Sequence, residues 1–145
     1  MLSADDVADY IVKKMGTITA MKLQKLIYYC QVWSLVWDEK PLFNDEIEAW
    51  LSGPVVRKLY ENHKGQYSVN QWSFGDASKV QGIEKETIDS VLDYYGDKSA
   101  QWLSDLTHKE DPWLIARKGL SPNERGSRVI SHADMMEYYG SLEED

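Results

Sequence analysis

The segment from Ala20 to Trp37 constrains the fold more than any other part of this chain. It contains no Gly or Pro, and its apolar residues fall in two neighbouring stripes at helical spacing. The stripes comprise Leu23, Leu26, Ile27, Cys30 and Trp37, and Tyr29, Val32, Trp33 and Val36. A helix that is apolar on more than half of its circumference is buried on several sides. We therefore expect a central buried helix, capped by Thr19, with Lys22 and Lys25 off the densest stripe and solvated.

The rest of the chain predicts shorter elements. Ser3, followed by two aspartates, is typical of a helix start, and Gly16 ends that helix. Further helices are expected over 54–63, 84–95, after a Ser99 cap, over 112–118, and over 132–139 after a Ser131 cap, with Trp102 and Met136 facing inward. Alternating residues predict a strand over 46–51, and 128–130 could form another. The predicted fold is mainly α: a single compact domain (1–145) of about six to seven helices around a central buried helix, with one or two short β-strands and a frayed acidic tail (141–145).

Net charge limits the partners. The 145 residues include 16 basic and 24 acidic side chains, which gives a formal net charge of −8. Such a surface repels phosphate backbones, and the densest basic stretch, over 117–128, is too diffuse to outweigh it. No expected helix is basic enough to act as a DNA recognition helix. We therefore expect no nucleic acid partner, and an acidic surface that attracts basic proteins.

The sequence also indicates a cytoplasmic protein. Cys30 is the only cysteine, so an intramolecular disulfide and a cysteine-based zinc site are excluded. The first residues lack the basic and then apolar pattern of a signal peptide. No apolar run approaches the ~20 residues of a membrane span, so we expect no stable membrane association.

Motifs for catalysis are missing. The chain has no Gly-rich phosphate loop, no nucleophile elbow and no His-Glu-x-x-His pair. The cluster from Thr107 to Asp111 includes His108 and Glu110, which could hold a metal or transfer protons. The favoured interpretation is structural: Asp111 before Pro112 would cap the following helix, while Thr107 and His108 satisfy the end of the preceding one. We expect no catalytic residue, no metal and no cofactor.

Four blocks of sequence resemble one family. They run from Met21 to Leu35, from Lys40 to Phe43, from Ile47 to Val56 and from Thr107 to Arg117. In this order and spacing they resemble the Panacea antitoxin domain, found in SocA-like and GepA-like phage-associated proteins. The resemblance implies the antitoxin of a type II toxin–antitoxin system, which neutralises a toxin encoded by the adjacent gene through direct stoichiometric binding. SocA-like members are also proteolytic adaptors, so delivery of the bound toxin to a protease is the alternative.

The candidate site residues form two sets. The irregular segment 64–82 is long enough to be functional, and its aromatic residues either fold back onto the core or remain exposed. Together with the preceding helix it provides the expected partner-binding residues Arg57, Tyr60, Tyr67, Trp72 and Phe74. The family-motif residues are expected to act mainly as scaffold, several of them through buried hydrogen bonds. They are Gln24, Gln31, Trp33, Glu48, Trp50, Gly53, Pro54, His108, Asp111, Pro112 and Trp113.

Overall fold

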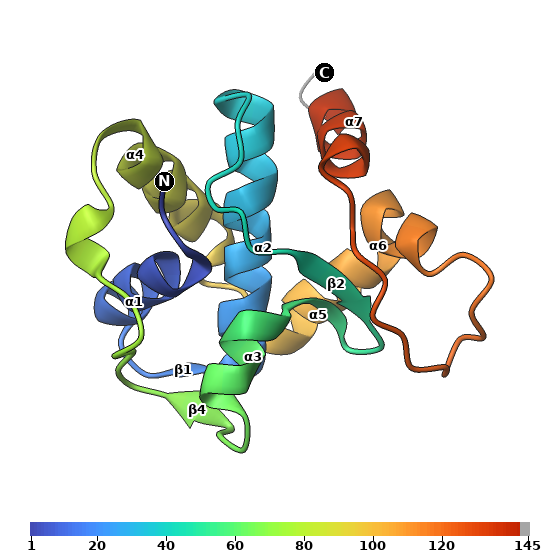
Figure 1. The fold of residues 1–145 in the computed structure, drawn as a ribbon, viewed down its shortest axis with the longest axis horizontal. Helices are drawn as coiled ribbons and strands as arrows, with labels where there is room; N and C mark the ends of the chain where they lie inside the picture. The colour runs from blue at the N-terminus through green and yellow to red at the C-terminus, as the bar shows by residue number, and fades with distance from the viewer. Residues whose placement is uncertain (143–145) are drawn as a thin grey trace.

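The computed structural model describes residues 1–142 (Figure 1). Over these residues the fold is mainly α, as predicted. The helices are α1 (Ala4–Met15), α2 (Ala20–Trp37), α3 (Arg57–His63), α4 (Gly82–Tyr95), α5 (Ala100–Lys109), α6 (Asp111–Ala116) and α7 (His132–Leu142), with a 3-10 turn over Ala77–Lys79. The strands are β1 (Ile18–Thr19), β2 (Ile47–Trp50), β3 (Gly53–Val56) and β4 (Ser68–Val69). They form two separate antiparallel pairs, β1–β4 and β2–β3.

Helix α2 is the centre of the fold, which confirms the prediction. It runs through the middle of the molecule, with α1 and α4 on one side and α6 and α7 on the other (Figure 1). Every residue from Leu23 to Leu35 is buried, and α4, α5, α7 and β3 all pack against this helix. The expectation that Lys25 is solvated is wrong, because its side chain is 1% exposed. The β2–β3 pair, called the hairpin from here on, and α5 cover the side of α2 that carries Lys25. The sequence of α2 alone could not reveal this burial.

Helix starts follow the predicted capping chemistry. Ser3 caps α1 and forms a capping box with Asp6. Thr19 accepts a hydrogen bond from the backbone of Lys22 at 3.1 Å, and Ser99 accepts one from Trp102 at 3.0 Å. Ser131 caps α7 in the same way. Each cap satisfies an amide that the first helical turn leaves unpaired, so these boundaries could be found from sequence alone.

Asp111 is an exception to the predicted caps. Glu110 occupies the cap position of α6 without a side-chain cap bond, and Asp111 is the first helical residue and exposed. Trp102 and Met136, expected to face inward, are 41% and 40% exposed. Helix α7 continues to Leu142, so residues 141 and 142 of the expected frayed tail are helical. Residues 143–145 lie outside the described residues.

The predicted helix over 54–63 begins three residues too early. Residues 54–56 belong to β3, which pairs with β2 in a register that places Trp50 opposite Gly53 and Ile47 opposite Val56. Gly53 has φ 115°, a conformation that favours glycine and allows the tight reversal between the strands. The side chain of Gln24 bonds both the amide and the carbonyl of Val56, which holds this stretch extended until α3 begins.

The outer sides of β2 and β1 bind segments from elsewhere in the chain. Val129 forms an isolated bridge with Glu48, so the expected strand over 128–130 is present only as this single antiparallel contact on β2. Strand β4 pairs with β1, with Ile18 opposite Val69. This pairing ties the irregular segment 64–82 to the start of α2. Strands of two residues that lie this far apart in the chain give no sequence signal for pairing.

Candidate partner-binding surface

The β2–β3 hairpin is fixed to the helices by side chains that bond its backbone. Gln24 bonds Val56 on both sides, with 2.9 Å to its amide and 3.2 Å to its carbonyl. Other side chains reach successive carbonyls: Arg117 to Ala49 (3.1 Å), Trp113 to Trp50 (2.8 Å), His108 to Leu51 (2.9 Å), Ser104 to Ser52 (3.3 Å) and Lys25 to Pro54 (3.3 Å). The motif residues Gln24, His108 and Trp113 therefore meet at one structural element, although they are far apart in sequence.

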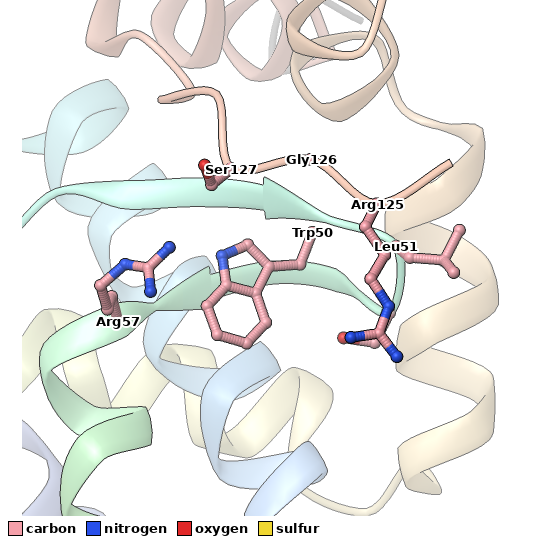
Figure 2. Close-up of a pocket in the computed structure, with 7 residues that line it drawn as sticks. Trp50, Leu51, Arg57, Arg125, Gly126 and Ser127 are labelled. Carbon is pink, nitrogen blue, oxygen red and sulfur yellow. The ribbon is translucent and has the colours of Figure 1, made fainter. Parts of the chain in front are cut away.

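Arg117 also positions the loop beside the hairpin. This side chain is buried, and its second guanidinium nitrogen bonds the carbonyl of Glu124. The guanidinium thus joins the hairpin to residues 121–127, and the loop places Arg125 beside Leu51 (Figure 2). Arg117 was predicted as part of a diffuse basic stretch and as the end of the fourth motif block, and its role as a buried link between the hairpin and the loop was missed.

Trp50 is the centre of the exposed hairpin face. The alternation in β2 buries Ile47 and Ala49 and turns Glu48 and Trp50 outward. The Arg57 guanidinium lies 5.2 Å from the centre of the Trp50 ring, a cation–π distance. Both Arg57 and the Trp50 indole donate hydrogen bonds to the Glu48 carboxylate, at 2.8 Å each at their shortest. The indole orientation is therefore fixed before any partner arrives.

The charge on Glu48 is stabilised in this arrangement. Partial burial raises the pKa of its carboxyl, but the hydrogen bonds from Arg57 and Trp50 outweigh burial and hold the pKa below its ordinary value. Glu48 therefore remains an anion at neutral pH and keeps Arg57 in place over the indole.

An aromatic row continues from Trp50 across α3. Successive ring centres are 5.0 Å apart from Trp50 to Tyr60, 5.5 Å from Tyr60 to His63, 6.2 Å from His63 to Trp72 and 5.6 Å from Trp72 to Phe74. We call these five rings the aromatic row. The row joins the hairpin to the irregular segment, and most of its contacts are edge-to-face, the arrangement that ring quadrupoles favour.

The predicted partner-binding residues do not all reach the surface. Arg57 is exposed and Tyr60 is half-buried, and both contact the Trp50 side chain or its neighbours. Phe74 is 55% exposed, whereas Trp72 is 4% exposed and donates its indole hydrogen to Asp5 at 3.0 Å. Trp72 thus anchors the segment to α1, and it supports the surface from below. Tyr67 is 85% exposed and lies outside the row.

Sequence reasoning assigned Trp50 to the scaffold, whereas the structure places its ring on the surface. Its backbone carbonyl does have a scaffold contact, with Trp113. The signal for this half-buried ring was present in the alternation of residues 46–51, which puts Trp50 on the same side of the strand as Glu48.

Trp50 lies between two hollows. One has a volume of about 660 Å³ and is lined by Trp50, Leu51, Ser52, Arg57, Arg125, Gly126 and Ser127 (Figure 2). In Figure 2 the indole lies between Arg57 and Arg125, on the outer side of the hairpin. The second hollow, of about 170 Å³, lies between α2, the hairpin and α3. Its lining residues are Ala20, Met21, Gln24, Lys25, Trp50, Ser52, Val55, Tyr60 and His63.

The second hollow has an unusual electrostatic character. Burial lowers the pKa of the Lys25 ammonium from its ordinary value of 10.5 to about 8. His63 is also buried, and its pKa is lowered by burial and further by the charge of Lys25. Its ring lies 3.0 Å from the Gln24 amide nitrogen. A cation and an imidazole thus share this small space.

The titratable side chains of the cluster around His108 do not converge. The His108 ring faces the carbonyls of Ser104 and Leu51, at 2.6 and 2.9 Å. Glu110 points into the core, where it accepts hydrogen bonds from Tyr29 and Tyr139, and Asp111 is exposed. These three side chains therefore diverge. Across residues 1–142, no group of three or more His, Cys, Asp or Glu side chains could hold a metal ion.

The remaining motif residues lie in other parts of the scaffold. Gln31 is fully buried and bonds the backbone of Leu42 and Phe43, at 2.7 and 2.8 Å at the shortest. Trp33 donates to the hydroxyl of Tyr95 at 3.1 Å. Pro112 lies in the first turn of α6, where its missing amide hydrogen removes no helical bond.

A second aromatic surface lies away from the hairpin. It is a groove of about 520 Å³ between α2, α4 and α5, lined by Trp33, Trp37, Ser90, Val91, Tyr94, Tyr95, Trp102, Leu106, Glu110 and Leu142. Among residues 1–142, no arginine or lysine lines this groove, although the Lys98 ammonium lies 5.1 Å from the centre of the Trp102 ring. It is the natural competitor of the aromatic row as a binding surface.

The comparisons with known proteins agree with the motif blocks. The family model described as antitoxin SocA-like, Panacea domain, matches residues 23–114. No curated protein and no solved structure matched the chain. None of the helices within residues 1–142 has the length and apolar character needed to cross a membrane. The matched region includes α2, the hairpin, α3, the aromatic row and the α5–α6 corner that anchors the hairpin, and it covers more than half of the sequence. This chain belongs to the family of SocA-like antitoxins with a Panacea domain.

Proposed function

We propose that this chain is the antitoxin of a type II toxin–antitoxin pair, and that it neutralises the toxin of the adjacent gene by binding it without catalysis. Membership of the SocA-like antitoxin family carries the proposal. The contact surface consists of the accessible members of the aromatic row, Trp50, Tyr60 and Phe74, together with Arg57. Trp, Tyr and Arg are the residue types that dominate binding energy at protein interfaces. Here all three types meet at Trp50.

The preorganised hairpin supports this choice of surface. Glu48 and Arg57 lock the Trp50 ring, and side chains from α2, α5 and α6 hold the backbone beneath it. A partner therefore meets a surface whose side-chain entropy is already reduced, which favours tight binding. The competing groove has aromatic walls but lacks an arginine within them.

Charge gives the complex an orientation. The chain carries a net charge of −8, which attracts a basic toxin over long distances. At the hairpin the local charge is reversed, since Arg57 and Arg125 line the larger hollow. An acidic patch within an otherwise basic partner would match both features.

The experiment is co-expression with the product of the adjacent gene. We expect the two proteins to co-purify in a fixed ratio and growth to be restored. Absence of both a complex and rescue would contradict the proposal. An unchanged lifetime of the toxin in the complex would separate neutralisation by binding from delivery to a protease.

A pair of tryptophan variants localises the surface. Trp50→Ala should raise the dissociation constant about 100-fold, the effect typical of a central interface tryptophan. Trp102→Ala removes a comparably large, 41% exposed indole from α5 and is the matched control, for which we expect the dissociation constant to be unchanged. The reverse result would move the interface to the groove between α2, α4 and α5.

A further inference from the structure

We propose that the smaller hollow is a carboxylate-binding recess: it receives the side chain of an Asp or Glu from the bound protein, and the carboxylate pairs with the Lys25 ammonium. This inference deepens the proposed function and rests on it for the identity of the partner. The recess lies directly beside Trp50, so one partner surface can cover the indole and enter the recess.

The first observation is that Lys25 is a buried cation without an anion. Its side chain is 1% exposed, and no carboxylate of residues 1–142 forms a salt bridge with it. Its single hydrogen-bond acceptor is the carbonyl of Pro54, at 3.3 Å. An ammonium has three donors, so two are left for a ligand. Burying a charge without a counter-charge is strongly unfavourable, and such groups concentrate at functional sites.

The second observation is that the hairpin packs closely over the end of the Lys25 side chain. A β-carbon built at position 53 would lie 2.7 Å from the Lys25 Cε and 3.2 Å from its Nζ, so any residue larger than glycine would collide with the lysine. The same position lies 3.2 Å from the Thr107 hydroxyl of α5. Gly53 therefore lets the hairpin close over the end of the lysine side chain, and Lys25 is among the residues that line the recess.

The third observation is the shape and chemistry of the recess. Its volume of about 170 Å³ suits one side chain, and its walls include Met21, Val55 and the rings of Trp50 and Tyr60. Apolar walls suit the methylene part of an Asp or Glu side chain, and the single cation suits one negative charge. A phosphate group would need several donors or cations, and the acidic surface of the chain repels polyanions.

Other titratable groups near Lys25 do not supply the missing anion. His63 of α3 and Tyr60 line the recess, and neither carries a negative charge at neutral pH. Glu48 is the acidic residue within the hairpin (47–56), and its carboxylate accepts hydrogen bonds from Arg57 and Trp50. The counter-charge must therefore come from outside the described chain.

The direct test uses acetate as the probe and the folded, unmodified chain. Nuclear magnetic resonance of the Lys25 Cε, with ionic strength held constant by chloride, reports both binding and the lysine pKa. We expect saturable shifts at Lys25 and at the Trp50 indole, with the Lys25 pKa rising from about 8 as acetate binds. Absence of an acetate-dependent change at Lys25 would overturn the inference, whether or not a toxin complex has been found.

The second test measures affinity for the adjacent-gene protein. Lys25→Met keeps the length of the side chain and removes the charge, and we expect it to weaken the complex at least tenfold, about 1.4 kcal/mol. Lys13→Met removes an equal charge from the exposed face of α1, where the side chain is 71% exposed, and should leave affinity unchanged. Equal affinities for the wild type and Lys25→Met would overturn the inference while the proposed function stands. Absence of any complex with the wild type would remove the proposed function and leave the acetate result to decide the recess.

Discussion

Glu110 and Lys25 are both buried ionisable residues that lie on or against α2, and their surroundings differ. Glu110 accepts hydrogen bonds from Tyr29 at 2.6 Å and from Tyr139 at 2.7 Å, and Tyr139 also contacts the Tyr28 hydroxyl at 3.0 Å. The hydroxyls of Tyr29 and Tyr139 therefore both donate to the Glu110 carboxylate. Within residues 1–142, Lys25 has one acceptor, the carbonyl of Pro54, and it lines a recess. Glu110 thus has two donors within the described part of the chain, although burial still raises the pKa of its carboxyl, whereas Lys25 has a single acceptor and no counter-charge there.

The difference separates stability from function. A closed hydrogen-bond cluster stabilises the fold only as a whole, because removing one member leaves the others unpaired in the interior. An incomplete cation destabilises the free chain and gains a partner only on binding. Stability variants should therefore have their largest effects at the tyrosine–Glu110 cluster, and binding variants at the hairpin.

The largest loss of stability is expected for Glu110→Ala. It leaves the hydroxyls of Tyr29 and Tyr139 without their shared acceptor and opens a cavity, so the free energy of unfolding should fall by about 3 kcal/mol. Urea denaturation measures this loss. Glu110→Gln keeps a carbonyl acceptor and should lose less than half as much. A loss below about 1 kcal/mol for Glu110→Ala would show that the cluster is not closed.

The next effect is a pH dependence due to Lys25. Its pKa is about 8 in the folded chain and 10.5 ordinarily, so between these values the unfolded chain binds the extra proton. The free energy of unfolding therefore rises with pH across that window, because the penalty for burying the Lys25 charge disappears. The rise is about 2 kcal/mol between about pH 8 and about pH 9.5. The destabilisation is fully present below about pH 8.

The measurement is the difference in unfolding free energy between the wild type and Lys25→Met as pH is raised. The variant removes only this titration, so other lysines and tyrosines cancel in the difference. A difference that stays constant with pH would mean that Lys25 is not a buried, uncompensated cation.

The smallest effect compares two tyrosine hydroxyls. Tyr139→Phe removes a hydroxyl that bonds both Glu110 and Tyr28, and should cost about 1.5 kcal/mol of stability. Tyr60→Phe removes a hydroxyl from a half-buried ring in the aromatic row, and should change stability by less than about 0.5 kcal/mol. Thermal unfolding of the two variants side by side measures the contrast, and equal losses would erase the distinction between the regions.

Local signals in the sequence predicted much of the fold. The stripes on α2 and the hydroxyl caps of α1, α2, α5 and α7 depend on neighbouring residues, so they could be read directly. Pro54 to Val56 could not, because proline at a helix start is equally compatible with an edge strand, and the Gln24 side chain decides between them. Lys25 was placed wrongly for the same reason: its cover comes from the hairpin and α5, which are distant in sequence.

The candidate site was only partly predictable. The alternation of residues 46–51 contains the outward position of Trp50, whereas Trp72 bonds Asp5, which lies 67 residues earlier in the chain. The recess at Lys25 requires Gly53, α3 and α2 to meet, and no single segment indicates it. Long-range contacts, rather than composition, create the surface.

Hydrogen–deuterium exchange of the chain alone and bound to the adjacent-gene protein tests the central claim most directly. Binding at the hairpin face predicts slower amide exchange within residues 47–63 of the complex. Exchange in α4 and α7 should be unchanged. Slowing confined to α4, α5 and the end of α7, with 47–63 unchanged, would place the partner on the competing aromatic groove and contradict the account.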